Sequence, residues 1–290
     1  MSPLDRLHSV TSRILDADKY AYGELFAACD ELYKTLLQLT GIDTEENSNR
    51  EHLSLESGNA IGLTWAAMCI KDLMRTKRFM DGIYEATAAK AEANPGRPVH
   101  ILYAGTGPFA TLVLPLTARF SSQQLQFTLL EVNENSYTCL QQLIKTLQIE
   151  NYIHRLEKAD AAKWTLPANE QVDIFISETM QQGLKNEPQV TICMNLVPQL
   201  QNNTIIIPEQ ITLIAALIDH QKKGLENSEA VESENAVHNL GNCFHPQQRN
   251  YIAACYGLPR SKRKPLSFSF RNGYHSARGL RQIPSTLPAY

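Results

Sequence analysis

The chain has 290 residues, of which 43% are hydrophobic and 20% charged, and a net charge of −3 at pH 7. This length allows one large core, or one α/β domain with a smaller module. The near-neutral charge argues against a nucleic-acid binder that neutralises many phosphates. No apolar window approaches the ~20 residues that a membrane helix needs. We therefore expect neither nucleic acid nor a membrane among the partners.

The six cysteines are dispersed, without a pair at C-x-x-C spacing. Because the N-terminus also lacks the apolar run of a signal peptide, this pattern predicts a reduced, cytoplasmic protein. His238, Cys243 and His245 come closest to a set of metal ligands. A fourth ligand and the usual short spacings are absent, so we predict no metal site.

Two amphipathic helices are predicted near the N-terminus, because apolar residues recur at helical spacing over 4–14 and 25–39. The polar stretch 43–52 is typical of a linker or loop. Helical spacing returns over 61–93. We therefore predict an N-terminal helical segment over 1–60, and its amphipathic helices can serve a homodimer.

The period changes after residue 98, where short apolar or β-branched runs alternate with segments of helix length. The runs cover residues 99–103, 127–130, 152–156, 172–176 and 204–207. Such alternation predicts βαβ units and a parallel sheet. We therefore expect an α/β fold with a Rossmann-like, mostly parallel sheet over 61–208.

The remainder, 209–290, is predicted to form a small β-rich module for substrate binding or dimerisation. Strand-like pieces occur at 211–217, 252–256 and 266–270, without a long helical pattern between them. The acidic, small-residue-rich stretch 222–242 indicates a mobile excursion.

A glycine loop follows the first predicted strand, with Gly105, Thr106 and Gly107 leading into a segment that we expect to be helical. Such a loop brings bare backbone beside a ligand at the carboxyl edge of the sheet. The second strand ends at Glu131, whose carboxylate can accept both hydrogen bonds of a ribose diol.

The third strand leads to Asp160 and Ala161, where a polar side chain or a backbone amide can meet an adenine edge. Together with the glycine loop and Glu131, these features fit S-adenosylmethionine and a nicotinamide dinucleotide equally well.

The fourth predicted strand distinguishes these cofactors, because Glu178 and Glu187 follow it on one loop. Ligands of open sheets bind at this edge. Two carboxylates there form a clamp for a planar cation, although a solvated loop with incidental acids is the alternative. The pair favours a methyltransferase.

At this point the chain resembles the protein arginine methyltransferases, which are class I S-adenosylmethionine-dependent enzymes. Residues 70–76 are similar to the family's Leu-Lys-Asp-x-x-Arg-Thr element, and 177–180 with Glu187 are similar to its double-glutamate loop. The resemblance implies that Arg75 pairs with the carboxylate of the cofactor's methionine part, and that Glu178 and Glu187 hold the substrate guanidinium. The other expected contacts of S-adenosylmethionine are Gly105, Thr106, Gly107, Glu131, Asp160 and Ala161.

The chain departs from the family at Thr179, Gln181 and Gln182, where the family has a bulky residue and a Gly-Tyr pair. Its C-terminal remainder is also shorter than the family's β-barrel and lacks a Thr-His-Trp element. We therefore expect a small guanidine such as free arginine as substrate, in preference to a peptide. The alternatives are an N- or O-methyltransferase with another acceptor, an NAD-dependent oxidoreductase, and a scaffold without activity.

Overall fold

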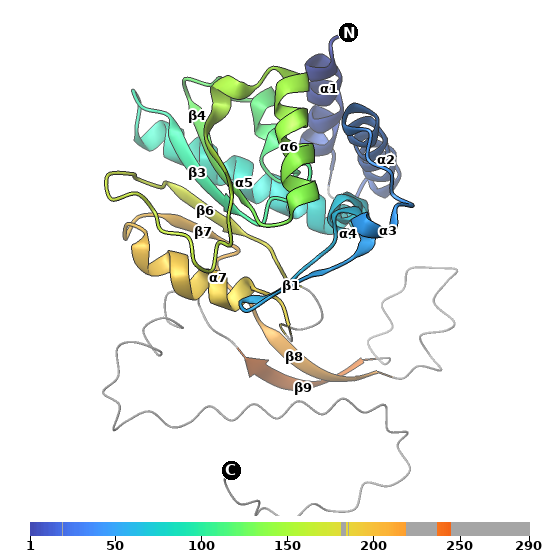
Figure 1. The fold of residues 1–290 in the computed structure, drawn as a ribbon, viewed down its shortest axis with the longest axis vertical. Coiled ribbons are helices and arrows are strands. Elements are labelled where there is room, and N and C mark those ends of the chain that lie inside the picture. The colour runs from blue at the N-terminus through green and yellow to red at the C-terminus, as the bar shows by residue number, and fades with distance from the viewer. Residues whose placement is uncertain (19, 181–183, 185, 219–236, 245–290) are drawn as a thin grey trace, which may run out of the picture.

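A computed structural model describes residues 1–18, 20–180, 184, 186–218 and 237–244. Its centre is a five-stranded parallel sheet of order β5-β4-β3-β6-β7 (Figure 1). The strands are β3 (Val99–Ala104), β4 (Leu125–Glu131), β5 (Ile153–Lys158), β6 (Ile174–Ser177) and β7 (Ile205–Ile207). The chain runs outward from β3 to β5 and then crosses back to β6, so the order reverses between β3 and β6. This topology confirms the predicted Rossmann-like sheet and places its switch point at the ends of those two strands.

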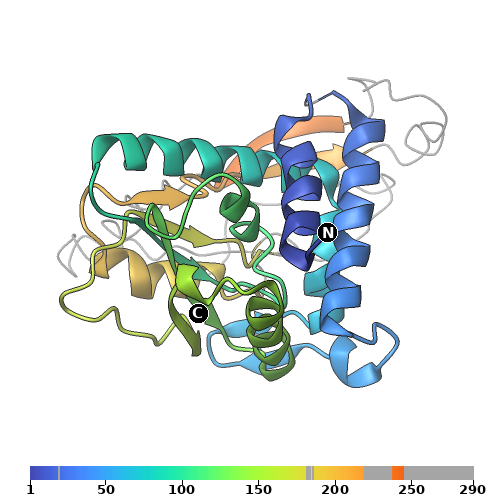
Figure 2. The same ribbon diagram turned by 90° about the horizontal axis from the view of Figure 1, so that it is seen from above.

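Helices cover both faces of the sheet, and α5 and α7 lie on opposite faces (Figure 2). One face packs on α1 (Pro3–Asp16), α2 (Tyr22–Thr40), α5 (Leu73–Ala93) and α6 (Glu134–Leu147). The other packs on α7 (Gln189–Leu196). Strand β3 shows why: Ile101 and Tyr103 belong to the first core and Leu102 to the second, because successive side chains of a strand point to opposite faces.

The predicted N-terminal helices are confirmed. Ser2 and Asp5 form a capping box at the start of α1, and Gly41 ends α2 in a left-handed conformation. Their buried residues, such as Ile14 and Leu32, share one core with the sheet. The boundary that we predict at residue 60 stays a prediction.

The helical run over 61–93 is divided into α4 (Leu63–Met68), the 3₁₀ turn η1 (Cys69–Lys71) and α5. Asp72 causes the break, because its backbone is extended and its carboxylate accepts a hydrogen bond from the Arg75 amide at 3.2 Å. The division places Arg75 in the first turn of α5.

The helix expected after the glycine loop is absent from the described residues. Residues 107–113 form turns, and the 3₁₀ helix η2 (Leu114–Ala118) follows. Pro108 and Pro115 lack the N–H that a helix needs, and Ala110 has a left-handed φ of 43°. Burial of apolar side chains such as Phe109 holds the segment in place instead.

The stretch predicted as a linker contains α3 (Asn47–Arg50), and a hairpin of β1 (Leu53–Leu55) and β2 (Gly58–Ala60) follows it. Near the C-terminus, β8 (Leu213–Ile218) pairs with β9 (Val237–Phe244). The prediction of a mobile excursion is therefore wrong at 237–242, where backbone pairing overrides an unpromising composition. The strand-like pieces after residue 250 lie outside the described residues. Among the described helices, none is long and apolar enough to cross a membrane.

Candidate active site

A cavity of about 300 Å³ opens at the carboxyl ends of β3, β4 and β6. This volume lies at the lower end of the range of small-molecule sites, ~300–1,000 Å³. The cavity is lined by every predicted site residue except Glu187, namely Arg75, Gly105, Thr106, Gly107, Glu131, Asp160, Ala161 and Glu178. The fold therefore brings together residues that are up to about a hundred positions apart, as Arg75 and Glu178 are 103 positions apart.

Glu131 holds the glycine loop in shape. Its carboxylate is 5% exposed and accepts hydrogen bonds from the Gly107 amide (2.7 Å), the Asn133 amide (2.8 Å) and the Thr106 hydroxyl (3.3 Å). Burial raises the pKa of Glu131, and these hydrogen bonds oppose the rise. The carboxylate predicted to bind a ribose thus also organises the backbone beside it.

Position 105 requires glycine for two reasons. Its φ of +77° is left-handed, which glycine adopts without cost. A Cβ there would also lie 2.3 Å from Cγ2 of Thr179, on the loop after β6. The glycine loop and the loop of Glu178 are therefore in direct contact across the switch point.

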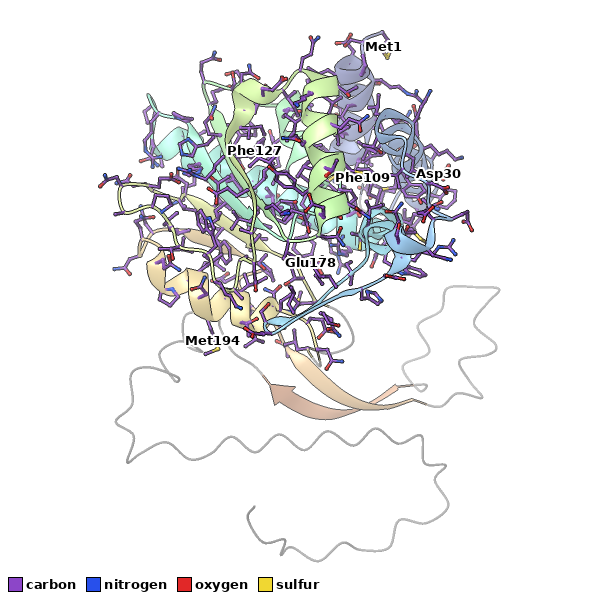
Figure 3. The ribbon with its side chains drawn as sticks, viewed as in Figure 1. Met1, Asp30, Phe109, Phe127, Glu178 and Met194 are labelled. Atoms are coloured by element: carbon purple, nitrogen blue, oxygen red, sulfur yellow. The ribbon has the colours of Figure 1, made fainter. Side chains whose placement is uncertain are left out.

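Arg75 and Glu178 form an ion pair inside the cavity. Their side chains are only 21% and 11% exposed, so the pair is poorly screened by solvent. Glu178 lies on the side of the sheet toward the β1–β2 hairpin (Figure 3). The residue expected to hold a cofactor carboxylate and the residue expected to hold a cationic substrate thus neutralise each other.

Gln189, which sequence reasoning missed, fixes the loop after β6. Its fully buried amide oxygen accepts hydrogen bonds from the amide (2.9 Å) and the hydroxyl (3.0 Å) of Thr179. Its amide nitrogen donates to Sγ of Cys193 at 3.3 Å. The signal for this role is a polar residue that shares the buried face of α7 with Ile192, Cys193 and Leu196.

Glu187 does not line the cavity. It is half-buried, and its carboxylate accepts a hydrogen bond from the Asn186 amide of its own loop at 3.1 Å. Residues 181–183 and 185, between the two glutamates, lie outside the described part of the chain. A substrate contact by Glu187 stays a prediction.

The β1–β2 hairpin covers the cavity, and sequence reasoning missed it too. The Ser57 hydroxyl donates to Oδ2 of Asp160 at 2.9 Å, and the carbonyl of Ser57 accepts from the Thr191 hydroxyl at 2.8 Å. At Gly58 a Cβ would meet three backbone atoms of residues 186–188 within 2.9 Å. The hairpin tip thus bridges the end of β5 and the start of α7.

These groups suit a ligand that has hydrogen-bond donors at one end and an anionic group at the other. Glu131 and Asp160 contribute carboxylates to the lining, and Arg75 contributes a guanidinium. Gly105 and Gly107 line the cavity without a side chain, and Cγ2 of Thr179 takes the space beside Gly105. Glu178 adds a carboxylate beside Arg75.

No family model matches the chain, and no curated protein matches it. Among solved structures it is similar to the PRMT1 enzyme–prozyme heterotetrameric complex with AdoHcy from Trypanosoma brucei, at 16% identity and a TM-score of 0.42, over 56% of this chain and 49% of that one. It is similar to Arabidopsis thaliana protein arginine methyltransferase 10, at 16% identity and a TM-score of 0.39, over 52% and 41%. It is also similar to the [4+2]-cyclase SpnF, at 17% identity and a TM-score of 0.33, over 45% of each chain.

The chain spans about half the length of these proteins or less. The likeness is distant, and the matched proteins differ in the reaction that they are named for. Because one fold hosts many functions, the function of this chain has to be argued from its site.

Proposed function

We propose that this chain is an S-adenosylmethionine-dependent methyltransferase that transfers a methyl group to a guanidino nitrogen of a small molecule. The observation that carries the proposal is the meeting of Arg75 and Glu178 in one cavity with the glycine loop and Glu131. A dinucleotide site needs the glycine loop and the acidic residue, but it gives no reason for this half-buried ion pair.

The residues present fit the cofactor. Gly105 and Gly107 carry no side chain, and we assign Glu131 to the ribose hydroxyls and Asp160 and Ala161 to the adenine because all of them line the cavity. Arg75 can form a bidentate pair with the carboxylate of the methionine part. When bound, the cofactor supplies an electrophilic methyl group, and the pocket's contribution is alignment.

Glu178 is the residue that we assign to the acceptor. A guanidinium is a poor nucleophile because its charge is delocalised and its pKa lies above about 12. Hydrogen bonds to a carboxylate concentrate the positive charge on the bound side and leave the remaining nitrogen more nucleophilic. The same carboxylate can accept the proton that the nitrogen loses.

The ion pair predicts an order of binding. Glu178 is engaged by Arg75 as long as Arg75 has no other anion. A cofactor carboxylate that takes Arg75 releases Glu178, so we expect the cofactor to raise the affinity for the acceptor.

A second candidate is a methyltransferase with an amine acceptor. It is favoured by the position of Glu187, whose carboxylate is bonded to its own loop outside the cavity lining. A single carboxylate suffices for an ammonium group, whereas the double clamp requires Glu187 to turn inward.

Two further expectations belong to this proposal. We propose the division into 1–60, 61–208 and 209–290, with the last segment contributing to the substrate side.

We also propose a homodimer through α2, because Tyr22 (55%) and Phe26 (63%) are exposed on it. The similar Trypanosoma brucei protein is a heterotetrameric complex. Light scattering of Phe26→Asp against the parent protein tests the dimer, and an unchanged mass would contradict it.

The test of the function is mass spectrometry of guanidines, amines and peptides incubated with the protein and isotope-labelled S-adenosylmethionine. We expect label in a small guanidine such as free arginine, and none with Glu178→Gln. Label in amines alone would select the second candidate. Label in no compound, with NADH turned over instead, would exclude both.

A further inference from the structure

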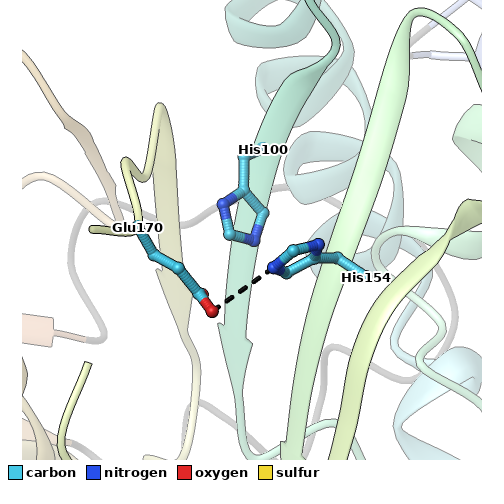
Figure 4. Close-up of side chains that lie close together, drawn as sticks. All are labelled: His100, His154 and Glu170. Carbon is cyan, nitrogen blue, oxygen red and sulfur yellow. Dashed lines mark ion pairs between the residues drawn. The ribbon is translucent and has the colours of Figure 1, made fainter. Parts of the chain in front are cut away.

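His100, His154 and Glu170 lie together at the other end of the sheet, away from the proposed active site (Figure 4). His100 is the second residue of β3, and the cavity is lined from Tyr103 of the same strand onward. At ~3.3 Å per residue, the two places are roughly 10 Å apart along the strand. The three side chains point toward one another, and their ligand atoms all lie within 4.8 Å.

The ring of His100 is held in one orientation. It is 9% exposed, and its Nδ1–H donates to the carbonyl of Gln171 at 2.8 Å. Because a carbonyl only accepts, Nδ1 carries the proton of the neutral ring, and the lone pair of Nε2 faces the Thr128 hydroxyl at 2.8 Å. A metal-bound histidine has the same arrangement, with the other N–H donated to a carbonyl. A cation at Nε2 would require the Thr128 side chain to rotate about χ1, so that its hydroxyl oxygen no longer faces the ring.

His154 is brought to His100 by an irregularity in the sheet. Phe127 pairs with Ile153 and Thr128 with Arg155, so His154 is the extra residue of a β-bulge. Bulges re-aim side chains, and here the two imidazole rings meet edge to face with centroids 4.9 Å apart. Nε2 of His154 lies 3.3 Å from Oε1 of Glu170.

Glu170 supplies an oxygen that lacks a partner. Its side chain is 13% exposed, and Oε2 is buried without a hydrogen bond among the described residues. Such an atom is costly in a folded protein. Oε1 is also paired with Arg155, but that guanidinium has a second carboxylate, Glu157, at 3.4 Å. Arg155 therefore keeps an anionic partner if Glu170 turns to a cation.

Although the sequence predicts no metal site, we propose that His100, His154 and Glu170, which the fold brings together, form a binding site for a divalent transition-metal ion of the zinc class. Two imidazole nitrogens and one carboxylate are a recurrent ligand set for such ions and leave a position for water. Magnesium and calcium prefer oxygen ligands throughout. The bound ion would tie β3, the bulge of β5 and the segment before β6 together, so its expected role is to stabilise this end of the sheet.

The experiment is calorimetric titration of the full chain with zinc chloride after removal of metals by a chelator. The variants are His154→Ala and Glu170→Gln. His8→Asn is the control, because His8 is a half-buried histidine outside the cluster whose ring is bonded to Thr117 at 3.1 Å. Circular dichroism checks folding, and since His154 is 43% exposed its variant has little packing to lose.

Loss of an outer-sphere partner costs ~10–100-fold in metal affinity, so loss of a direct ligand should cost at least about tenfold. Cysteines and other histidines also bind zinc. The decisive result is therefore the loss of one equivalent of bound zinc per chain in each folded variant, while the control retains it. Zinc should also raise the melting temperature of the parent and of the control, but not that of His154→Ala or Glu170→Gln. Equal zinc binding by parent and variants, or none by the parent, would overturn the proposal.

Discussion

Glu178 is the residue whose role the structure constrains most. It is half-buried beside Arg75 in a cavity that every other predicted site residue except Glu187 lines. Glu178→Gln keeps the shape but removes the charge that, in the proposed mechanism, polarises and deprotonates a guanidine. We expect turnover to fall at least ~100-fold, as for loss of a general base, with the affinity for S-adenosylhomocysteine changed only a few-fold. Labelled methyl transfer and calorimetry measure the two, and unimpaired turnover would remove Glu178 from the mechanism.

Gln189 fixes the same loop through its hydrogen bonds with Thr179. Gln189→Leu leaves the amide and hydroxyl of Thr179 without their acceptor, which costs roughly 1–3 kcal/mol. Urea unfolding should show this loss, and kcat should fall more than KM rises because Glu178 is then poorly placed. The control is Gln141→Leu on the exposed face of α6, expected within ~0.5 kcal/mol of the parent. Equal stability of the two variants would contradict the assigned role.

At the scale of elements, the contact between the glycine loop and the loop after β6 shapes the site. Gly105→Ala forces an alanine into a left-handed conformation, at about 1–2 kcal/mol, and against Cγ2 of Thr179. We expect lower stability and weaker cofactor binding. The added change Thr179→Ser removes Cγ2 but keeps the hydroxyl, so it should restore part of both.

The matched control for that series is Gly82→Ala. Gly82 lies within α5 with nothing near its missing Cβ, so alanine there should stabilise the helix by up to ~1 kcal/mol. If Gly105→Ala behaves like Gly82→Ala, the loops do not meet as described.

Some of the helices and strands could be predicted from the sequence and others could not. The sheet strands and the first two helices were predictable because their apolar periodicity is strong, and the glycine loop and Glu131 followed from their places at strand ends. The β1–β2 hairpin was not, because its three-residue strands carry no periodic signal and are held by tertiary contacts such as Ser57 to Asp160. The missing helix after Gly107 was readable in part, since Pro108 and Pro115 are both present. Pairing of β9 with a distant strand had no local signal.

At the scale of the whole molecule, Asp173 joins the strands at the amino end of the sheet. Its carboxylate is 4% exposed and accepts from the Arg97 guanidinium (2.6 and 2.7 Å) and from the His100 amide (2.9 Å). Burial alone would raise the pKa of Asp173, but these hydrogen bonds and the charge of Arg97 bring it below its ordinary value.

The sign of the pH dependence follows from this lowered pKa. The folded state holds the Asp173 proton more weakly than the unfolded state, so the stabilisation is complete above the unfolded pKa, ~3.9, and is lost as the pH falls through the folded pKa. We expect Asp173→Asn to lower the free energy of unfolding at pH 7 by roughly 1–3 kcal/mol and to flatten its decline in acid. Asp16→Asn, which removes an exposed pair with Arg119, should change little. An unaltered acid profile in Asp173→Asn would contradict this account.

The proposed activity requires the cavity to bind a sulfonium nucleoside with its carboxylate at Arg75. Calorimetric titration of the parent protein with S-adenosylhomocysteine and, separately, with NADH tests this most directly. We predict saturable binding of S-adenosylhomocysteine with one equivalent per chain, at least tenfold weaker in Arg75→Ala, and no binding of NADH. Binding of NADH, or S-adenosylhomocysteine affinity that is unaffected by Arg75→Ala, would contradict the central claim.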